Sequence, residues 1–232
     1  APAFGTAVTL PMYSTCIQFM ARAQRSREAV LILDRIRKAG LEPDLRCLNF
    51  AISACGRSGR WEQALRILRG TEDGVGIAPN VITYNAAITA CRKGRQCERA
   101  VALLRDMPAR GVSPNVASYS SAISALGDAG RWEEAALALL GEMLPSAGVS
   151  PNVFHFNAAV SACAACGRWE EAVSLLGEME RASVAADVVT YSAAIAACGN
   201  GLQFERAVAL LREMPAKGVR PNAFHYNAAI SA

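Results

Sequence analysis

The apolar residues of the chain follow two alternating patterns, each with the spacing of an amphipathic helix. In residues 81–115 the first pattern places apolar or aromatic residues at i, i+3, i+4 and i+7, namely Tyr84, Ala87, Ile88 and Cys91. Gly94 breaks this pattern, a second periodic run covers residues 98–107, and Gly111 and Pro114 close the segment. The segment is therefore predicted to form two short antiparallel helices.

The same pair of patterns recurs along the chain with a period of 35 residues or slightly more. The 12-residue string that begins at Val81 has echoes that begin at Leu10, Leu45, Val116, Val153, Val188 and Ala223. Such a period predicts an all-α solenoid, because one helical hairpin is too small to bury its own apolar face and must stack on its neighbours. Function is then expected along an extended surface and not in a single pocket.

These echoes divide the chain into an N-terminal extension, residues 1–9, and a repeat array, residues 10–232. The predicted repeats are 10–44, 45–80, 81–115, 116–152, 153–187 and 188–222, with a partial seventh repeat at 223–232. One extra residue near 71–76 and two near 144–148 fall after second helices, where loops absorb insertions. Because the sequence stops inside the seventh copy, we expect a fragment of a longer array.

An aromatic residue recurs at the start of the second helix. This place is occupied by Trp61, Trp132, Trp169 and Phe204. A large side chain at one fixed place in each hairpin is what packing between helices requires, so these rings are expected in the core and not as a stacking platform. The glutamates that follow Trp132 and Trp169 are expected in the first helical turn, where the helix dipole favours carboxylates.

Composition supports a folded chain and excludes several classes of protein. Of the 232 residues 52% are hydrophobic and 19% are charged, which argues against disorder. No apolar run approaches the roughly 18 residues needed to cross a bilayer, and residues 1–9 lack the features of a secretory signal. Membrane insertion is therefore not expected.

The net charge of +4 is unevenly distributed. Residues 10–115 contain 17 Lys and Arg against 9 Asp and Glu, whereas residues 116–232 contain 7 against 11. A polyanion is therefore expected to bind mainly the N-terminal half.

Cysteine and histidine do not form a recognisable metal site. Four of the eight cysteines occupy the eleventh place of their repeats, which predicts small core residues in a reducing compartment: Cys55, Cys91, Cys163 and Cys198. Cys163 and Cys166 form a C-x-x-C without a second pair, and His155 and His225 have no partner at ligand spacing. The sequence also has no phosphate-binding loop or nucleophile elbow, so we expect no catalytic residues, metal, cofactor or small-molecule substrate.

Three motifs recur in register: V-x-T-Y-N-A-A-I-x-A, G-R-W-E-E-A-x-x-L-L-x-E-M and G-V-x-P-N. On these motifs the chain resembles the pentatricopeptide repeat (PPR) family over residues 10–232. The tetratricopeptide signature W-x-x-L-G-x-x-Y is absent. The resemblance implies a right-handed superhelical solenoid of helix-turn-helix repeats that binds single-stranded RNA in a mitochondrion or chloroplast.

In this family the fifth and last residues of a repeat jointly select one base. Carried over by position, the pairs are Ser14 with Asp44, Asn49 with Asn80, Asn85 with Asn115, Ser120 with Asn152, Asn157 with Asp187, and Ser192 with Asn222, while Asn227 begins a seventh pair. The resemblance implies the element 5′-G, pyrimidine, pyrimidine, A, U, A, pyrimidine-3′. The same residue types also cap helices and form turns, but six pairs in register favour base selection.

Two further positions carry implied roles. The second residue of each repeat wedges a base, which suits Ile82, Phe154, Val189 and Phe224 but not Pro11, Arg46 or Ala117. The thirteenth residue faces phosphate; it is Arg22, Arg57 and Lys93 in the first three repeats, then Asp128, Ala165 and Asn200. The N-terminal half is thus expected to bind RNA strongly and the C-terminal half weakly.

Two functions remain open at this point. The first is a sequence-selective module that binds single-stranded RNA of an organellar transcript and acts in processing, stabilisation or translation by occupying its site. The alternative is a protein-interaction scaffold or structural subunit of a large organellar assembly such as a ribosome, with other proteins bound through the acidic C-terminal half. The regular fifth and last positions favour the first function.

Overall fold

The computed structural model describes residues 9–72, 77–133 and 150–230, together with residues 141, 143 and 148. Residues 1–8 and most of the two segments with extra residues therefore lie outside the described part of the chain. All regular secondary structure within the described residues is helical. Contacts divide the chain into two compact units, residues 1–112 (unit 1) and residues 113–232 (unit 2).

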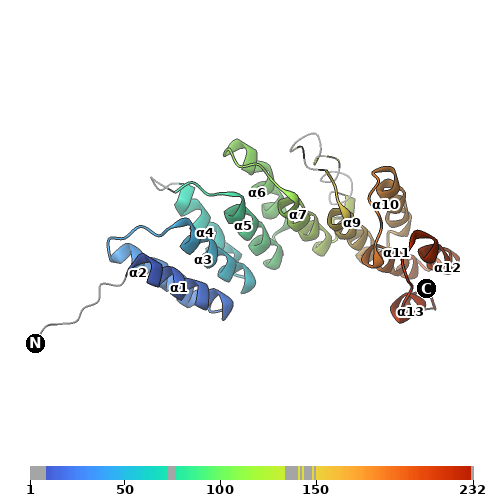
Figure 1. Ribbon diagram of the computed structural model, residues 1–232, viewed down its shortest axis with the longest axis horizontal. Helices are drawn as coiled ribbons and strands as arrows, with labels where there is room; N and C mark the ends of the chain where they lie inside the picture. Colours follow the sequence, from blue (N-terminus) through green and yellow to red (C-terminus); the bar gives the residue numbers. More distant parts are fainter. Residues whose placement is uncertain are drawn as a thin grey trace, which may run out of the picture. The chain divides into compact units, whose positions relative to one another are not determined.

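Unit 1 contains three helical hairpins (Figure 1). Its helices are α1 (Leu10–Arg22), α2 (Ser26–Lys38), α3 (Leu45–Arg57), α4 (Trp61–Glu72), α5 (Val81–Lys93) and α6 (Cys97–Ala109). The first helices of the hairpins, α1, α3 and α5, pack side by side in chain order. Helices α2 and α4 each pack between the first helix of their own hairpin and that of the next. This is the stacking that the periodicity predicts.

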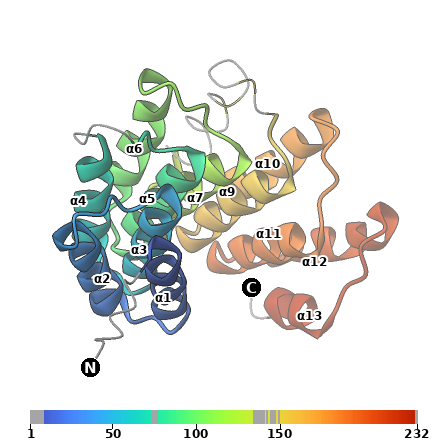
Figure 2. The ribbon, with the colours of Figure 1, turned by 60° about the vertical axis from the view of Figure 1, so that its left-hand side comes forward.

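Unit 2 continues the same pattern (Figure 2). Its described helices are α7 (Val116–Asp128), α9 (Val153–Ala165), α10 (Trp169–Arg181), α11 (Val188–Asn200), α12 (Phe204–Glu213), the 3-10 helix η2 (Met214–Lys217) and α13 (Ala223–Ile230). The first helices α7, α9, α11 and α13 again lie side by side. No described helix is long and apolar enough to cross a membrane.

The predicted apolar face of the first helix is confirmed. Tyr84, Ala87, Ile88 and Cys91 are each at most 1% exposed. Burial also raises the pKa of the Cys55 and Cys91 thiols to about 11 and that of Cys163 to about 12. These thiols are protonated at neutral pH, so they behave as small apolar core groups and not as nucleophiles.

The predicted break at Gly94 is confirmed, because α5 ends at Lys93 and Gly94 is its C-cap residue. Gly94 has an ordinary φ of −81°, and it is Arg95 that adopts a left-handed φ of 57°. The fifteenth residue of every described repeat with this turn is left-handed: Gln24, Gly59, Arg95, Gly130, Gly167 and Leu202. Gly94 is small for another reason, because a Cβ there would lie 2.1 Å from Cδ1 of Trp61 in the preceding hairpin.

The tryptophans pack between neighbouring hairpins, as expected, but they are half-buried and not fully in the core. Trp61 lies against Gly94, and the Arg99 guanidinium stands 4.0 Å from its ring centroid. Trp169 lies against Gly201 in the same way. Phe204, which has the same place in its repeat, is exposed. The aromatic place thus joins one hairpin to the next at the turn.

Candidate nucleic-acid interface

The last residue of each repeat caps the first helix of the next. A side-chain Oδ1 accepts a backbone N–H at Asp44 (from Cys47, 2.7 Å), Asn80 (from Ile82, 3.0 Å), Asn115 (from Ser118, 3.1 Å), Asn152 (from Phe154, 3.1 Å), Asp187 (from Thr190, 2.9 Å) and Asn222 (from Phe224, 3.0 Å). Capping is the local role that the residue types also suggested.

The cap does not exclude base selection, because it engages only one side-chain oxygen. With Oδ1 held at the helix start, an Asn presents its Nδ2 amide as the second atom and can only donate through it. An Asp in the same cap presents Oδ2 and can only accept. The cap therefore fixes the polarity of the atom that remains, and the Asn or Asp choice becomes a choice between donor and acceptor.

The fifth residues lie on the first helices and differ in exposure. Asn49, Asn85, Ser120, Asn157 and Ser192 are half-buried, and Asn227 is exposed. Ser14 is buried, and its Oγ and the Oδ1 of Asn49 are buried without a hydrogen-bond partner. The first two sites are thus more enclosed than the others, and the role of Ser14 stays a prediction.

The structure brings the fifth predicted pair into direct contact. Nδ2 of Asn157 donates to both carboxylate oxygens of Asp187, at 3.2 Å and 3.3 Å. The hydroxyl of Thr190 donates to Oδ1 of Asn157 at 2.6 Å. Burial raises the pKa of Asp187, but the hydrogen bonds from Thr190 and Asn157 outweigh it and leave that pKa below its usual value. The carboxylate is therefore ionised at neutral pH.

The sixth pair is joined through a third side chain, His225. Its Nε2 lies 3.0 Å from Oγ of Ser192, and its Nδ1 accepts the backbone N–H of Asn222 at 3.0 Å. His155 has the equivalent place in the fifth repeat and lies 3.0 Å from the carbonyl oxygen of Val116. Sequence analysis gave these histidines no role. The third place of the repeat, where they stand, holds Met12, Cys47, Thr83, Ser118 and Thr190 in the other repeats.

The second residues of all repeats are exposed, and the four predicted base wedges are the large apolar ones among them. The exposed fractions are 60% for Ile82, 67% for Phe154, 54% for Val189 and 58% for Phe224. Each stands two positions after a capping residue on the chain, so the apolar surface lies near the polar pair. Apolar side chains with this exposure contribute little to the core and remain available for contact with a base.

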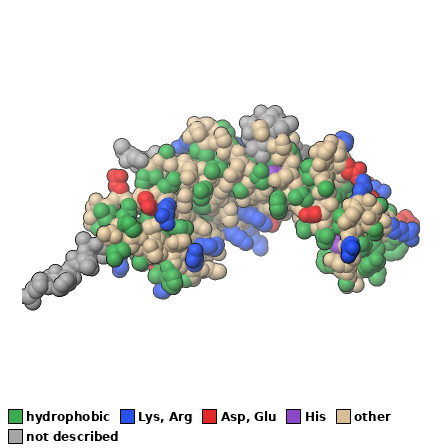
Figure 3. Space-filling view, in the orientation of Figure 1, with side chains coloured by type: hydrophobic (Ala, Val, Ile, Leu, Met, Phe, Trp, Pro, Cys, Tyr) green, Lys and Arg blue, Asp and Glu red, His purple; other side chains and the backbone are tan. Residues whose placement is uncertain are grey.

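The thirteenth residues have a structural role that sequence analysis missed. Nη2 of Arg57 donates to the carbonyl oxygen of Ala21 at 2.6 Å, and Nδ2 of Asn200 donates to that of Ala164 at 2.8 Å. Both bonds satisfy the end of the preceding first helix. Arg22, Arg57 and Lys93 are nevertheless exposed, and Lys and Arg side chains gather along the lower side of unit 1 (Figure 3).

Comparison with known families decides the identity of this fold. Models of the PPR repeat family match residues 79–128 and 151–200, a PPR repeat model matches 47–70, 117–144 and 189–219, and a pentatricopeptide repeat domain model matches 5–58. The chain belongs to the pentatricopeptide repeat family. The predicted all-α solenoid of helix-turn-helix repeats is thereby confirmed.

Solved structures agree with this assignment. The crystal structure of PPR10 from maize has a TM-score of 0.79 and 30% identity to this PPR chain, and the match covers 97% of this chain and 32% of PPR10. A complex of PPR10 with an 18-nt psaJ RNA element gives 0.60 and 26%, over 100% of this chain and 37% of that one. This chain thus spans about a third of PPR10.

A more distant likeness concerns the fold alone. The PPR domain of Arabidopsis thaliana protein-only RNase P 1, solved in complex with tRNA, matches with a TM-score of 0.61 at 16% identity, over 76% of this chain and 91% of that domain. A search of curated proteins found no match.

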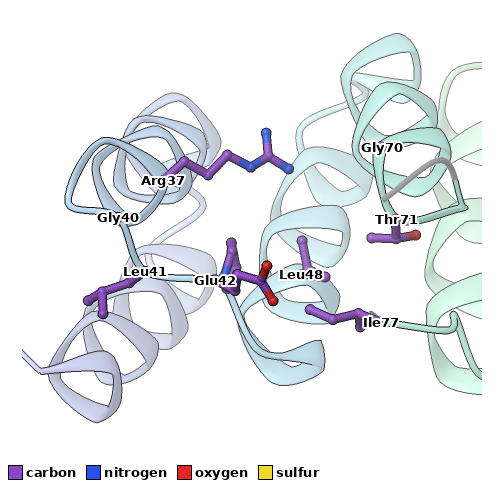
Figure 4. A pocket seen from close by; sticks show the side chains of 9 residues that line it. Arg37, Gly40, Leu41, Glu42, Leu48, Gly70, Thr71 and Ile77 are labelled. Atoms are coloured by element: carbon purple, nitrogen blue, oxygen red, sulfur yellow. The ribbon is translucent and has the colours of Figure 1, made fainter. Parts of the chain in front are cut away.

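One pocket of this PPR protein lies apart from the base-selecting residues (Figure 4). It has a volume of about 400 Å³ in unit 1, and Arg37 and Glu42 extend toward Leu48 and Thr71. None of the residues that line it is a predicted base-selecting, wedge or phosphate residue. Among the described residues, no group of three His, Cys, Asp or Glu side chains could hold a metal ion.

Proposed function

We propose that this chain is a sequence-selective module that binds single-stranded RNA, reads one base per repeat and acts on an organellar transcript by occupying its site. The observation that carries the proposal is the direct contact between the fifth and last residues of one repeat, Asn157 and Asp187, in a site whose polarity the helix cap fixes. Asn157 and Asp187 are the best-defined pair. Exposed apolar side chains beside the pairs add a surface on which bases can stack.

The hydrogen-bonding atoms of the fifth site suit uracil. After its bonds to Thr190 and Asp187, Asn157 keeps one Nδ2–H, and Asp187 keeps acceptor capacity at its carboxylate. Uracil offers a carbonyl oxygen to that donor and its N3–H to that acceptor. The adjacent pair of Ser192 and Asn222 is shorter on one side, which leaves room for a purine.

Similar proteins support RNA as the partner. PPR10 has been solved with an 18-nt RNA element, and the PPR domain of protein-only RNase P 1 with tRNA. The proposed element for this chain is 5′-G, pyrimidine, pyrimidine, A, U, A, pyrimidine-3′, with Ser14 and Asp44 at the first base and Asn227 at the last.

Competition binding on short RNAs tests this proposal. The element should compete better than the same nucleotides in permuted order, at physiological salt. Asn85→Ser should weaken the pyrimidine preference at the third nucleotide only, because the shorter side chain no longer reaches a small base. Equal competition by every permuted RNA would overturn the base code.

A second function is favoured by the charge of unit 2. Unit 2 carries 7 Lys and Arg against 11 Asp and Glu, and its thirteenth residues are Asp128, Ala165 and Asn200. Such a surface suits a protein partner in a larger assembly better than phosphate. In that case RNA binding would be insensitive to sequence and lost at physiological salt.

A further inference from the structure

The third residue is buried in every described repeat except the first, where Met12 is 53% exposed. The third side chain is a small polar group or a histidine in five described repeats, Thr83, Ser118, His155, Thr190 and His225, and all are completely buried. Buried polar groups are almost always hydrogen-bonded, so their partners show what they position. Two of these side chains contact a base-selecting residue of the preceding repeat. Thr190 contacts Asn157, and His225 contacts Ser192.

Thr190 shows the contact with an asparagine. Its hydroxyl lies 2.6 Å from Oδ1 of Asn157, and its Oγ1 also accepts the backbone N–H of Asp187 at 3.0 Å. The hydroxyl also lies 3.0 Å from Oδ1 of Asp187, so its single proton has two acceptors within reach. The Asp187 carboxylate can only accept, which requires the Nδ2 donor of Asn157 on its side. The Asn157 amide is therefore held with Nδ2 toward Asp187.

His225 shows the contact with a serine, and its proton can be assigned from its partners. Nδ1 accepts the Asn222 N–H, so in the neutral ring the proton is on Nε2. Nε2–H then donates to Oγ of Ser192 at 3.0 Å, while the Ser192 hydroxyl donates to the carbonyl oxygen of Val188 at 2.7 Å. The only hydroxyl proton of Ser192 is thus used in the bond to Val188, and one lone pair remains on its Oγ.

We propose that Thr190 and His225 are positioning residues of the fifth and sixth base-selecting sites, each placed in the repeat that follows its site, and that His225 makes Ser192 an acceptor toward the base. This inference rests on the proposed function. An acceptor at this place favours the exocyclic amino group of adenine and opposes the O6 oxygen of guanine. Without His225 the serine hydroxyl could turn and donate to guanine.

His155 provides a matched control within the same unit. It is buried like His225, and its Nδ1 accepts the Asn152 N–H at 3.1 Å in the same way. Its Nε2, however, lies 3.0 Å from the backbone carbonyl of Val116 and not from the fifth residue, Ser120. Nε2 of His225 also lies 3.5 Å from the equivalent backbone carbonyl, that of Val188. The two histidines thus share burial, capping and proximity to this carbonyl, and they differ in whether they contact a base-selecting side chain.

The experiment compares His225→Thr with His155→Thr in the full 232-residue chain. Threonine occupies the equivalent place at Thr83, where its hydroxyl accepts the backbone N–H of Asn80 and donates to Oδ1 of Asn80. Both variants therefore keep a hydrogen-bond partner for the capping residue. Competition between RNAs with A or G at the sixth nucleotide should show that His225→Thr lowers the preference for A roughly threefold to tenfold, the value of one hydrogen bond. His155→Thr should leave the A preference at the fourth nucleotide unchanged.

A second background shows whether His225 acts through Ser192. In Ser192→Ala the acceptor is absent, so adding His225→Thr should change the A to G ratio no further. Circular dichroism melts report whether the paired variants lose stability equally, and the ratio is insensitive to such a loss because both RNAs meet the same protein.

The outcomes separate the two proposals. A wild-type chain that discriminates at other nucleotides, with an A to G ratio unchanged in His225→Thr, would overturn the positioning role alone. A wild-type chain without any discrimination would overturn the proposed function itself. An equal loss of preference in both histidine variants, each at its own nucleotide, would assign the effect to buried volume and not to the bond with Ser192.

Discussion

Unit 1 and unit 2 have the same scaffold but divide charge and apolar surface between them. Unit 1 has 17 Lys and Arg against 9 Asp and Glu, and its second residues are Pro11, Arg46 and Ile82. Unit 2 has an excess of acidic residues, and its second residues are Ala117, Phe154, Val189 and Phe224. Cations are concentrated in unit 1, and exposed aromatic wedges are found in unit 2.

This division implies that the repeats that contribute most to RNA affinity need not be those that select the bases. Attraction between cations and phosphates acts over several ångströms and weakens with salt, whereas stacking requires contact and depends little on salt. We expect unit 1 to contribute most of the affinity at low salt. Unit 2, with its better-formed pair of Asn157 and Asp187, is expected to contribute more of the selectivity.

The largest expected effect comes from removing the cations of unit 1. In the triple variant Arg22→Asn, Arg57→Asn and Lys93→Asn, asparagine can keep the bond to the preceding helix that Asn200 makes to Ala164. Three lost phosphate contacts should lower the slope of log affinity against log salt by about 2 and the affinity about a hundredfold at low salt. Fluorescence anisotropy across a salt series measures both.

The reciprocal variant sharpens this comparison. Introducing lysine at Asp128, Ala165 and Asn200 should raise the affinity and steepen the salt dependence. If both variants bind RNA with the wild-type slope, the thirteenth residues do not face phosphate.

A smaller effect is expected from the wedges of unit 2. Phe154→Ala should weaken binding roughly tenfold, because one stacked base contributes about 1–3 kcal/mol. The melting temperature should stay nearly constant, since Phe154 is 67% exposed. Ala117→Phe, which adds a wedge in the same unit, should strengthen binding, and RNA affinity that ignores both changes would contradict stacking at the second position.

Exchange of the last residues between units should change selectivity by the value of one hydrogen bond, about threefold to tenfold. Asn80→Asp should shift the preference at the second nucleotide toward uracil, because Oδ1 still caps α5 while Oδ2, an acceptor, replaces the Nδ2 donor. Asp187→Asn should reduce the uracil preference at the fifth nucleotide. Competition with RNAs that differ at that one nucleotide measures each shift, and a change in overall affinity without a change in preference would contradict the scheme.

The smallest effect concerns pH. Burial holds the pKa of His155 below its usual value of 6.5, so the unfolded chain binds a proton more readily than the folded one. The stability that the neutral ring provides is present above pH 6.5 and is lost as pH falls toward the lower folded pKa. Thermal melts at pH 7 and pH 5 should show a fall of a few degrees that is smaller in His155→Thr. His155 is in unit 2, so unit 1 should lack this contribution to the pH dependence of stability.

Much of the fold could be predicted because the same spacing of apolar residues recurs in each repeat. The helices α1, α3, α5, α7, α9, α11 and α13 begin at the residues where the repeats were taken to begin. The pattern does not reveal why a residue stands at its place. The break at Gly94 is predicted correctly, but the approach of Trp61 from the preceding hairpin, which leaves no room for a Cβ at Gly94, is not visible in the pattern of one repeat.

The sequence predicts which residue types occupy the candidate site. It does not predict all of the hydrogen bonds between them. The sequence identified Asn157 and Asp187 as a pair, and the structure joins them. It gave no role to Thr190 or His225, because their partners belong to the preceding repeat and depend on how two hairpins stack. The bond from Arg57 to Ala21 was missed for the same reason.

The contacts across the repeat boundary also define the unit of exchange for protein engineering. The last residue of a repeat caps the next helix and is also proposed to face a nucleotide. Only the few residue types that can cap a helix are therefore allowed at this position. A transplanted cassette should run from the fifth residue of one repeat through the third residue of the next, so that donor, cap and support are moved together. Cutting at the repeat boundary would separate Asn157 from Thr190 and Ser192 from His225.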